Sequence, residues 1–183
     1  MRRFERTHSE ALDGMNPSYF RLRLPLSEAK RRLADWLGVA DLRDLVATDG
    51  VNAVRLACTP GGSWRGGALF MYQKEDWSVF EDLTGGFSSR SVSEWLPFAK
   101  TDELVFAGYN DAIGWGELVV IADGKVLRQF SYDPTNPETN VDTGSLPTES
   151  STPLKTWIEV ASFVDDDHLY GAETGWLWVR ESG

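Results

Sequence analysis

The stretch ELVVIADGKVLRQFSY, residues 117–132, decides the fold of this 183-residue chain. It contains two runs rich in apolar and β-branched residues, 117–122 and 126–132, which are separated by Asp123-Gly124. Asp-Gly between two such runs is a strong signal for a β-hairpin, because both turn residues readily adopt positive φ angles. The stretch therefore predicts two antiparallel strands that are neighbours in a sheet.

More strands are expected on both sides of this hairpin. In Tyr19–Leu24, Phe20, Leu22 and Leu24 alternate with arginines, which is typical of a half-buried strand. Further strands are predicted at 51–58, 68–73, 77–81, 104–109 and 176–179.

Four segments have helical patterns. Ser27 is placed to cap a helix that ends near Leu37, and residues 41–47 form a short second one. Ser91 with a glutamate three residues later has the spacing of a capping box. Thr152-Pro153 begins a fourth helix, after the proline-rich segment 133–152, which we expect to be a long loop.

The strands follow one another in hairpin order and do not alternate with helices. This pattern indicates an α+β fold with a largely antiparallel, twisted sheet of about seven strands and three or four helices. We expect residues 1–17 to form a flexible N-terminal arm and residues 18–183 to form one domain.

The chain is acidic, with 28 acidic and 18 basic residues and a net charge of −10. Its longest basic cluster, Lys30-Arg31-Arg32, lies in a predicted helix and is interpreted as a solvated face. An acidic surface repels nucleic acids and membranes but accelerates the encounter with a basic protein. We therefore expect a basic protein partner, with no nucleic acid and no membrane.

Residues that carry metal and thiol chemistry are scarce. His8, Cys58 and His168 stand far apart, whereas zinc sites need clustered ligands, and Asp165–Asp167 lack the spacing of a calcium loop. We expect no metal and no cofactor. The single cysteine fits a reducing compartment, and no signal segment is recognised, so the predicted location is the cytoplasm.

Catalytic motifs are equally weak. The chain has no G-x-S-x-G elbow and no phosphate-binding loop, and Cys58 lies on the apolar side of a predicted strand. Carboxylates that could pair for acid–base work are common on an acidic surface. They flank the hairpin of 68–81 and the 109–117 stretch: Glu75, Asp76, Glu81, Asp82, Asp111 and Glu117. We expect no enzymatic activity.

Seven of the eight tryptophans divide into three groups. Trp36, Trp95 and Trp157 lie on helix faces and are predicted to be core residues. Trp176 and Trp178 share one strand face, so both are buried or both form a patch. Trp64 and Trp115 lie in glycine-flanked loops, where each is an exposed anchor for a partner or part of a loop packed on the core.

The segments WSVFEDLTGG (77–86) and DELVFAGYND (102–111) look like those of small bacterial proteins. Within residues 68–132 the chain resembles the immunity proteins of contact-dependent or secreted toxin systems. Members of those families are small, acidic, cytoplasmic α+β domains that bind a toxin and block it. The resemblance provides no motif whose residues can be transferred one by one.

These patterns predict a non-enzymatic, cytoplasmic binding protein, an immunity protein that neutralises a bacterial toxin by occluding its active site. Acidic residues would steer the basic partner, and aromatic residues would anchor it. The predicted partner-binding residues are Trp64, Trp115, Asp111, Glu75, Asp76, Asp165, Asp166 and Asp167.

Two other functions stay open. A small-molecule-binding protein or hydrolase would show a deep Trp-lined pocket with a carboxylate pair, whereas a binding protein would show a flat acidic face rimmed by Trp64 and Trp115. A structural subunit would show an apolar patch, through Trp176 and Trp178. The sequence leaves the oligomeric state open.

Overall fold

A computed structural model describes residues 18–39, 41–88, 90–165 and 174–181. Its strands are β1 (Ser18–Leu22), β2 (Val46–Asp49), β3 (Gly66–Lys74), β4 (Trp77–Asp82), β5 (Leu104–Asn110), β6 (Trp115–Ala122), β7 (Lys125–Tyr132), β8 (Val141–Gly144) and β9 (Thr174–Glu181). Its α-helices are α1 (Leu26–Leu37), α2 (Gly50–Ala57), α3 (Val92–Ala99) and α4 (Trp157–Asp165), and two 3₁₀ turns are η1 (Pro137–Thr139) and η2 (Pro147–Ser150). The predicted arm, residues 1–17, lies outside the described residues.

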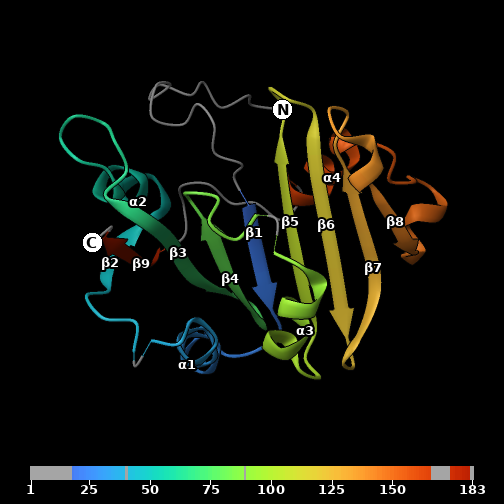
Figure 1. The fold of residues 1–183 in the computed structure, drawn as a ribbon. Coiled ribbons are helices and arrows are strands. Elements are labelled where there is room, and N and C mark those ends of the chain that lie inside the picture. Colours follow the sequence, from blue (N-terminus) through green and yellow to red (C-terminus); the bar gives the residue numbers. More distant parts are fainter. Residues whose placement is uncertain (1–17, 40, 89, 166–173, 182–183) are drawn as a thin grey trace.

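All nine strands belong to one sheet with the order β2-β9-β3-β4-β1-β5-β6-β7-β8, and every neighbouring pair is antiparallel. The α+β class and the antiparallel sheet are thus confirmed, and the strand count is somewhat higher than predicted. The additional strands are β2 and β8, which form the two edges of the sheet (Figure 1).

Strand β1 lies in the middle and joins two groups of strands. Its residues pair with β4 on one side and with β5 on the other, so that Phe20 is opposite both Phe80 and Phe106. The predicted alternation is present: Phe20 and Leu22 point to one face of the sheet and Tyr19 points to the other.

Each face of the sheet carries its own hydrophobic cluster and its own pair of helices. The first cluster contains Ala29 and Leu33 of α1 and Trp95 and Phe98 of α3, which surround Phe20. Phe20 stacks on Phe80 with ring centroids 4.6 Å apart. The second cluster contains Ala53 of α2 and Val160 of α4, so these two helices cover the opposite face.

The prediction of a strand at 51–58 is wrong, because these residues form α2. Asp49 caps this helix: its side chain accepts a hydrogen bond of 2.8 Å from the backbone N–H of Asn52. The helix buries Ala53 and Ala57, four residues apart, against the sheet, whereas Leu56 is exposed. Cys58 therefore follows a helix.

The predicted helix at 41–47 is also wrong, since its end belongs to edge strand β2, which pairs with β9.

Trp176 and Trp178 share a face of β9 but differ in burial, being 39% and 9% exposed. The helix predicted to end near Leu37 is present as α1, but Ser27 lies inside its first turn and does not cap it, since the N-cap residue is Pro25. The helix after Ser91 is present, and Glu94 accepts a hydrogen bond of 2.9 Å from the Ser91 backbone N–H.

The predicted Asp123-Gly124 hairpin is confirmed, with φ angles of +52° and +69° at the two turn residues. Such a turn matches the right-handed twist of the strands that it connects. The hairpin therefore forms from local signals, which explains why this part of the fold is readable from the sequence.

The segment 133–152 is not the structureless loop that we expected, since it contains η1, β8 and η2. Arg128 on β7 holds it in place. The Arg128 side chain is 2% exposed and contacts Glu149 at 2.7 Å and Asp142 at 2.7 Å, and it donates to the Thr143 carbonyl at 3.0 Å. One buried guanidinium thus ties β8 and η2 to the sheet.

We expect Arg128→Met to lower the free energy of unfolding by about 3 kcal/mol, because it leaves the half-buried Glu149 carboxylate without its cation. Urea unfolding followed by circular dichroism measures this loss. Arg31→Met is the matched control, since Arg31 on α1 also contacts two carboxylates but its side chain is 61% exposed. Equal losses in the two variants would contradict the assigned role of Arg128.

Candidate functional site

The eight predicted partner-binding residues do not form one site. The register places Leu22 opposite Ser78 and Leu104, and Ser18 opposite Asp82 and Gly108, so the β3–β4 and β5–β6 turns lie at opposite ends of the sheet. Glu75 and Asp76 therefore lie at one end, and Asp111 and Trp115 at the other. Asp165 is the last residue of α4, and Asp166 and Asp167 fall outside the described residues.

Trp64 lies apart from Trp115, because strands β4, β1 and β5 separate β3 from β6. The Trp64 backbone bridges to Cys58, and its side chain packs on the second cluster. Its indole Nε1 is buried and has no hydrogen-bond partner among the described residues. This arrangement agrees with the alternative that the loop packs on the core, and no acidic face rimmed by both tryptophans is formed by the described residues.

Asp76 belongs to a surface ion pair. Its carboxylate lies 3.1 Å from Arg23 Nε, and the two side chains are 60% and 48% exposed. Arg23 also contacts Glu103 at 2.8 Å. Exposed pairs of this kind contribute little stability. Arg23 nevertheless offsets part of the negative charge at this end of the molecule.

The β5–β6 turn, by contrast, packs tightly against the start of α4. A Cβ atom at Gly116 would lie 2.7 Å from Trp157 Cα, and one at Gly114 would lie 3.6 Å from Trp157 Cδ1 and 3.3 Å from Pro134 Cγ. Gly114 also has a φ of +74°, which favours glycine. The two glycines around Trp115 therefore let three distant segments of the chain meet.

Helix α4 begins at Trp157, later than predicted, because Glu159 caps it. The Glu159 carboxylate accepts hydrogen bonds from the Thr156 N–H at 2.8 Å and from the Lys155 N–H at 3.3 Å. Trp157 is half-buried and stacks on Tyr109, with ring centroids 6.1 Å apart and an interplanar angle of 17°. Our prediction of Trp157 as a plain core residue missed this position at the margin of the surface.

Two exposed isoleucines next to this contact were also missed. Ile113 in the β5–β6 turn is 50% exposed, and Ile158 in the first turn of α4 is 55% exposed. The glycines of Gly114-Trp115-Gly116 were the available sequence signal, because a Gly-x-Gly turn indicates close approach of another segment. The local sequence does not identify the segment that approaches.

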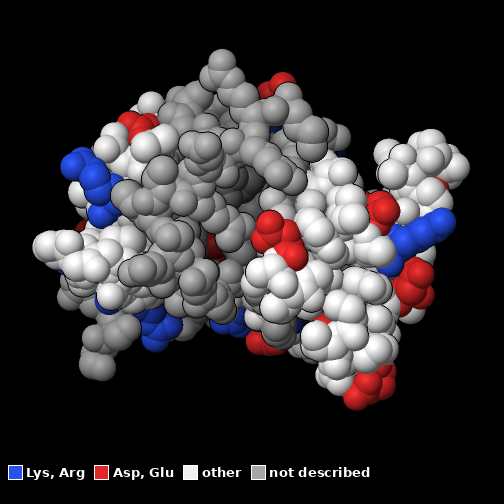
Figure 2. Space-filling model, turned by 90° about the horizontal axis from the view of Figure 1, so that it is seen from above, with Lys and Arg blue, Asp and Glu red and all other residues white. Residues whose placement is uncertain are grey.

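Acidic residues are concentrated in this half of the molecule. The span 104–165, which contains β5 to β8 and α4, holds nine acidic and three basic residues, so it carries a net charge of −6 out of −10. Its basic residues are Lys125, Lys155 and the buried Arg128. We call this span the acidic half. Figure 2 looks onto the end of the sheet where the β5–β6 turn lies, and acidic atoms predominate on the side of the acidic half.

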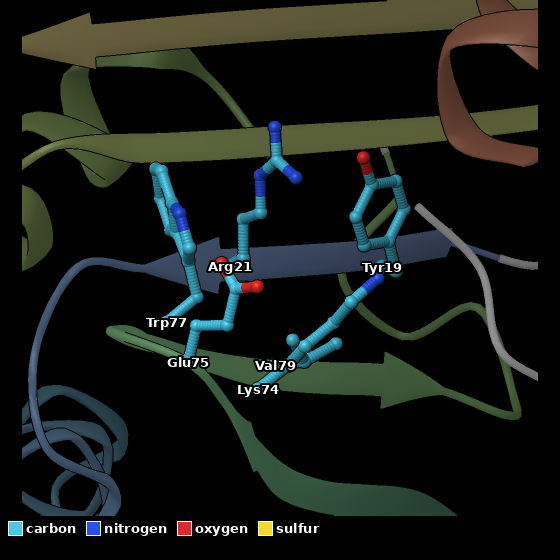
Figure 3. Close-up of a pocket in the computed structure, with 6 residues that line it drawn as sticks. All are labelled: Tyr19, Arg21, Lys74, Glu75, Trp77 and Val79. Carbon is cyan, nitrogen blue, oxygen red and sulfur yellow. The ribbon is translucent and has the colours of Figure 1, made fainter. Parts of the chain in front are cut away.

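A small pocket lies on the face of β1 that carries the second cluster. It has a volume of about 100 Å³. Its lining residues come from β1, the end of β3, the β3–β4 turn and β4: Tyr19, Arg21, Lys74, Glu75, Trp77 and Val79 (Figure 3). The Arg21 guanidinium lies 4.6 Å from the centroid of the Trp77 ring. Sites for drug-sized ligands usually measure about 300–1,000 Å³, so this pocket is small.

The carboxylates Glu81 and Asp82 do not form a pair, because successive strand residues point to opposite faces. Glu81 is buried on the face of the second cluster, where Tyr72 Oη donates to it at 3.1 Å. Asp82 lies on the first face and accepts hydrogen bonds from Ser18 Oγ at 3.0 Å and from the Phe87 N–H at 2.8 Å. Burial raises the pKa of Asp82, and it raises the pKa of Glu81 to about 7.

Within the described ranges, no group of three or more His, Cys, Asp or Glu residues is placed to hold a metal ion. His8 and His168 lie outside those ranges. No helix in the described part of the chain is long and apolar enough to cross a membrane.

The raised pKa of Glu81 predicts a dependence of stability on pH. The folded state retains this proton up to about pH 7, whereas the unfolded chain releases it near its ordinary value of 4.5. The free energy of unfolding should therefore fall as pH rises from 4.5 to 7, by up to about 3 kcal/mol. Urea unfolding across this range should show the fall in the wild type and a smaller one in Glu81→Gln. The exposed control Glu138→Gln should keep the wild-type slope, and an unchanged slope in Glu81→Gln would refute the assignment.

The contact between Gly116 and Trp157 predicts a second effect. Gly116→Ala should lower the free energy of unfolding by about 1–3 kcal/mol, because the added methyl group meets the backbone of α4. Gly67→Ala in β3 is the matched strand control, since nothing lies within 4 Å of its added Cβ. Chemical unfolding measures the free energy of unfolding of both variants. Similar losses in the two would show that the close contact of α4 with Gly116 does not contribute to stability.

No family model matches this chain, and no curated protein or solved structure matches it either.

Proposed function

We propose that this chain is a non-enzymatic binding protein whose acidic half holds a basic protein partner. The concentration of charge carries the proposal: a net charge of −6 lies within 62 consecutive residues that fold into one side of the sheet and the helix on it. A field of one sign over a continuous surface steers an oppositely charged protein and raises its rate of association.

Part of this charge lies at the surface. Arg128 is one cation between two carboxylates, Asp142 and Glu149, and the acidic half holds seven further acidic residues opposite Lys125 and Lys155. Asp111, Asp123 and Glu138 among these seven are exposed. The same surface would repel the phosphates of nucleic acids, so the proposed partner is a protein.

The specific form that we propose is neutralisation of a toxin in the cytoplasm, by covering the active site of that toxin. The resemblance of residues 68–132 to immunity proteins supports it, and a basic partner is what the acidic half would attract. Occlusion needs no catalytic group on this chain. It needs a surface whose charge and shape complement the partner.

A second candidate is a small-molecule site or hydrolase centred on the face of β1. The observation in its favour is Glu81, whose pKa of about 7 and hydrogen bond from Tyr72 are features of acid–base groups. The adjoining pocket of about 100 Å³ has room for little more than a few water molecules. We therefore prefer the protein-binding function.

Affinity capture with the full chain tests the proposal. Wild type, Asp123→Lys/Glu138→Lys and the control Asp35→Lys/Asp41→Lys are immobilised and exposed to extract of the encoding organism at about 50 mM and about 500 mM salt. The two double variants change the net charge by the same amount, and all four substituted residues are exposed. The captured protein is identified, purified and titrated against each variant.

We expect a basic protein that binds wild type and the control alike, binds Asp123→Lys/Glu138→Lys at least about 10-fold more weakly, and loses affinity at high salt. A partner that is not basic, or equal weakening in both doubles, would refute the proposed function.

A further inference from the structure

Three segments that are far apart in the sequence converge at the end of the acidic half. Gly114 of the β5–β6 turn lies against Pro134 and against Trp157, since a methyl group added at Gly114 would be 3.3 Å from Pro134 Cγ and 3.6 Å from Trp157 Cδ1. Ile113 and Ile158 are the chain neighbours of Gly114 and Trp157. We call Ile113, Pro134, Trp157 and Ile158 the turn patch.

The turn patch is apolar, and its two isoleucines are half exposed, at 50% and 55%. It is also held firmly. Trp157 stacks on Tyr109, and Gly116 brings the α4 backbone directly onto β6. An apolar surface that is already ordered loses little side-chain entropy on binding, which is a property of energetic anchors at interfaces.

Three acidic residues are close in the chain to members of the turn patch. Asp111 lies two positions before Ile113, Asp133 precedes Pro134 and Glu159 follows Ile158, whereas Lys155 is the single basic residue within three positions of the patch. The N-terminus of α4 is capped by Glu159, so its N–H groups do not form a site for an anion. The chemistry around the patch thus complements a cation.

We infer that the turn patch is the anchor point for the basic partner, and that its occupant is a lysine- or arginine-rich segment of that protein. The aliphatic stems of such side chains would pack over Ile113 and Ile158 and over the Trp157 ring, while their cationic ends face these carboxylates. This inference rests on the proposed function, and it names the place and the chemistry of contact.

Site-specific photocrosslinking locates the occupant. A photoreactive amino acid replaces Ile113 or Ile158 in the full chain, and Val51 or Val46 in the controls, which are likewise exposed apolar residues, at 62% and 45%, and lie outside the acidic half. The expected result is the same polypeptide crosslinked from Ile113 and from Ile158, through a segment rich in lysine or arginine, and not from the controls. A crosslink to a second copy of this chain, or equal crosslinking from all four positions, would overturn the inference.

The binding affinities of double variants then test whether the turn patch anchors the partner. With the purified partner, we expect Ile113→Ser/Ile158→Ser to bind about 30-fold more weakly than wild type, and Val51→Ser/Val46→Ser to bind within about 2-fold of it. Thermal unfolding checks that both doubles are folded. If the Asp123→Lys/Glu138→Lys double loses affinity but the isoleucine double does not, the turn patch is overturned as the anchor while the proposed function stands.

Discussion

The pairing of β1 with both β4 and β5 is the constraint on which the rest of the structure depends. Strands β2, β9, β3 and β4 form one side of the sheet and β5 to β8 form the other, and β1 provides the hydrogen-bonded link between them. This strand of five residues also supplies the centre of the first cluster, where Phe20 contacts the rings of Phe80 and Trp95. Because β1 is buried on both faces, each of the two hydrophobic clusters extends across it from one group of strands to the other.

The same division separates the charges of the molecule. The side that follows β1 in the sheet order is the acidic half, with Arg128 as its buried cation. On the other side, acidic and basic residues meet in local pairs such as Arg23 with Asp76 and Arg31 with Glu28. Six of the ten net negative charges thus lie on one side of the sheet, and this is why a surface for a basic protein is the function that we propose.

Local signals were readable from the sequence, and signals that depend on distant segments were not. The Asp123-Gly124 turn and the capping interaction of Ser91 with Glu94 involve residues within a few positions of each other, and both form as predicted. The segment 51–58 has an alternating pattern, yet it is a helix, because Asp49 caps it and its alanines allow close packing on the sheet. The predicted site residues were chosen by type and loop position, and the register then placed Glu75 and Asp111 at opposite ends of the sheet.

By itself, the sequence determined the α+β class, the antiparallel hairpins and the acidic character, because these follow from periodicity, turn chemistry and composition. The tertiary structure alone decided which residues share a surface. Gly114, Pro134 and Trp157 are about twenty residues or more apart, and they come together because Gly114 and Gly116 permit α4 and Pro134 to approach the start of β6. Likewise, burial raises the pKa of Glu81, and burial is a property of the packed sheet face. Long-range packing is what determines where the charges and the exposed apolar residues of the chain lie in the folded protein.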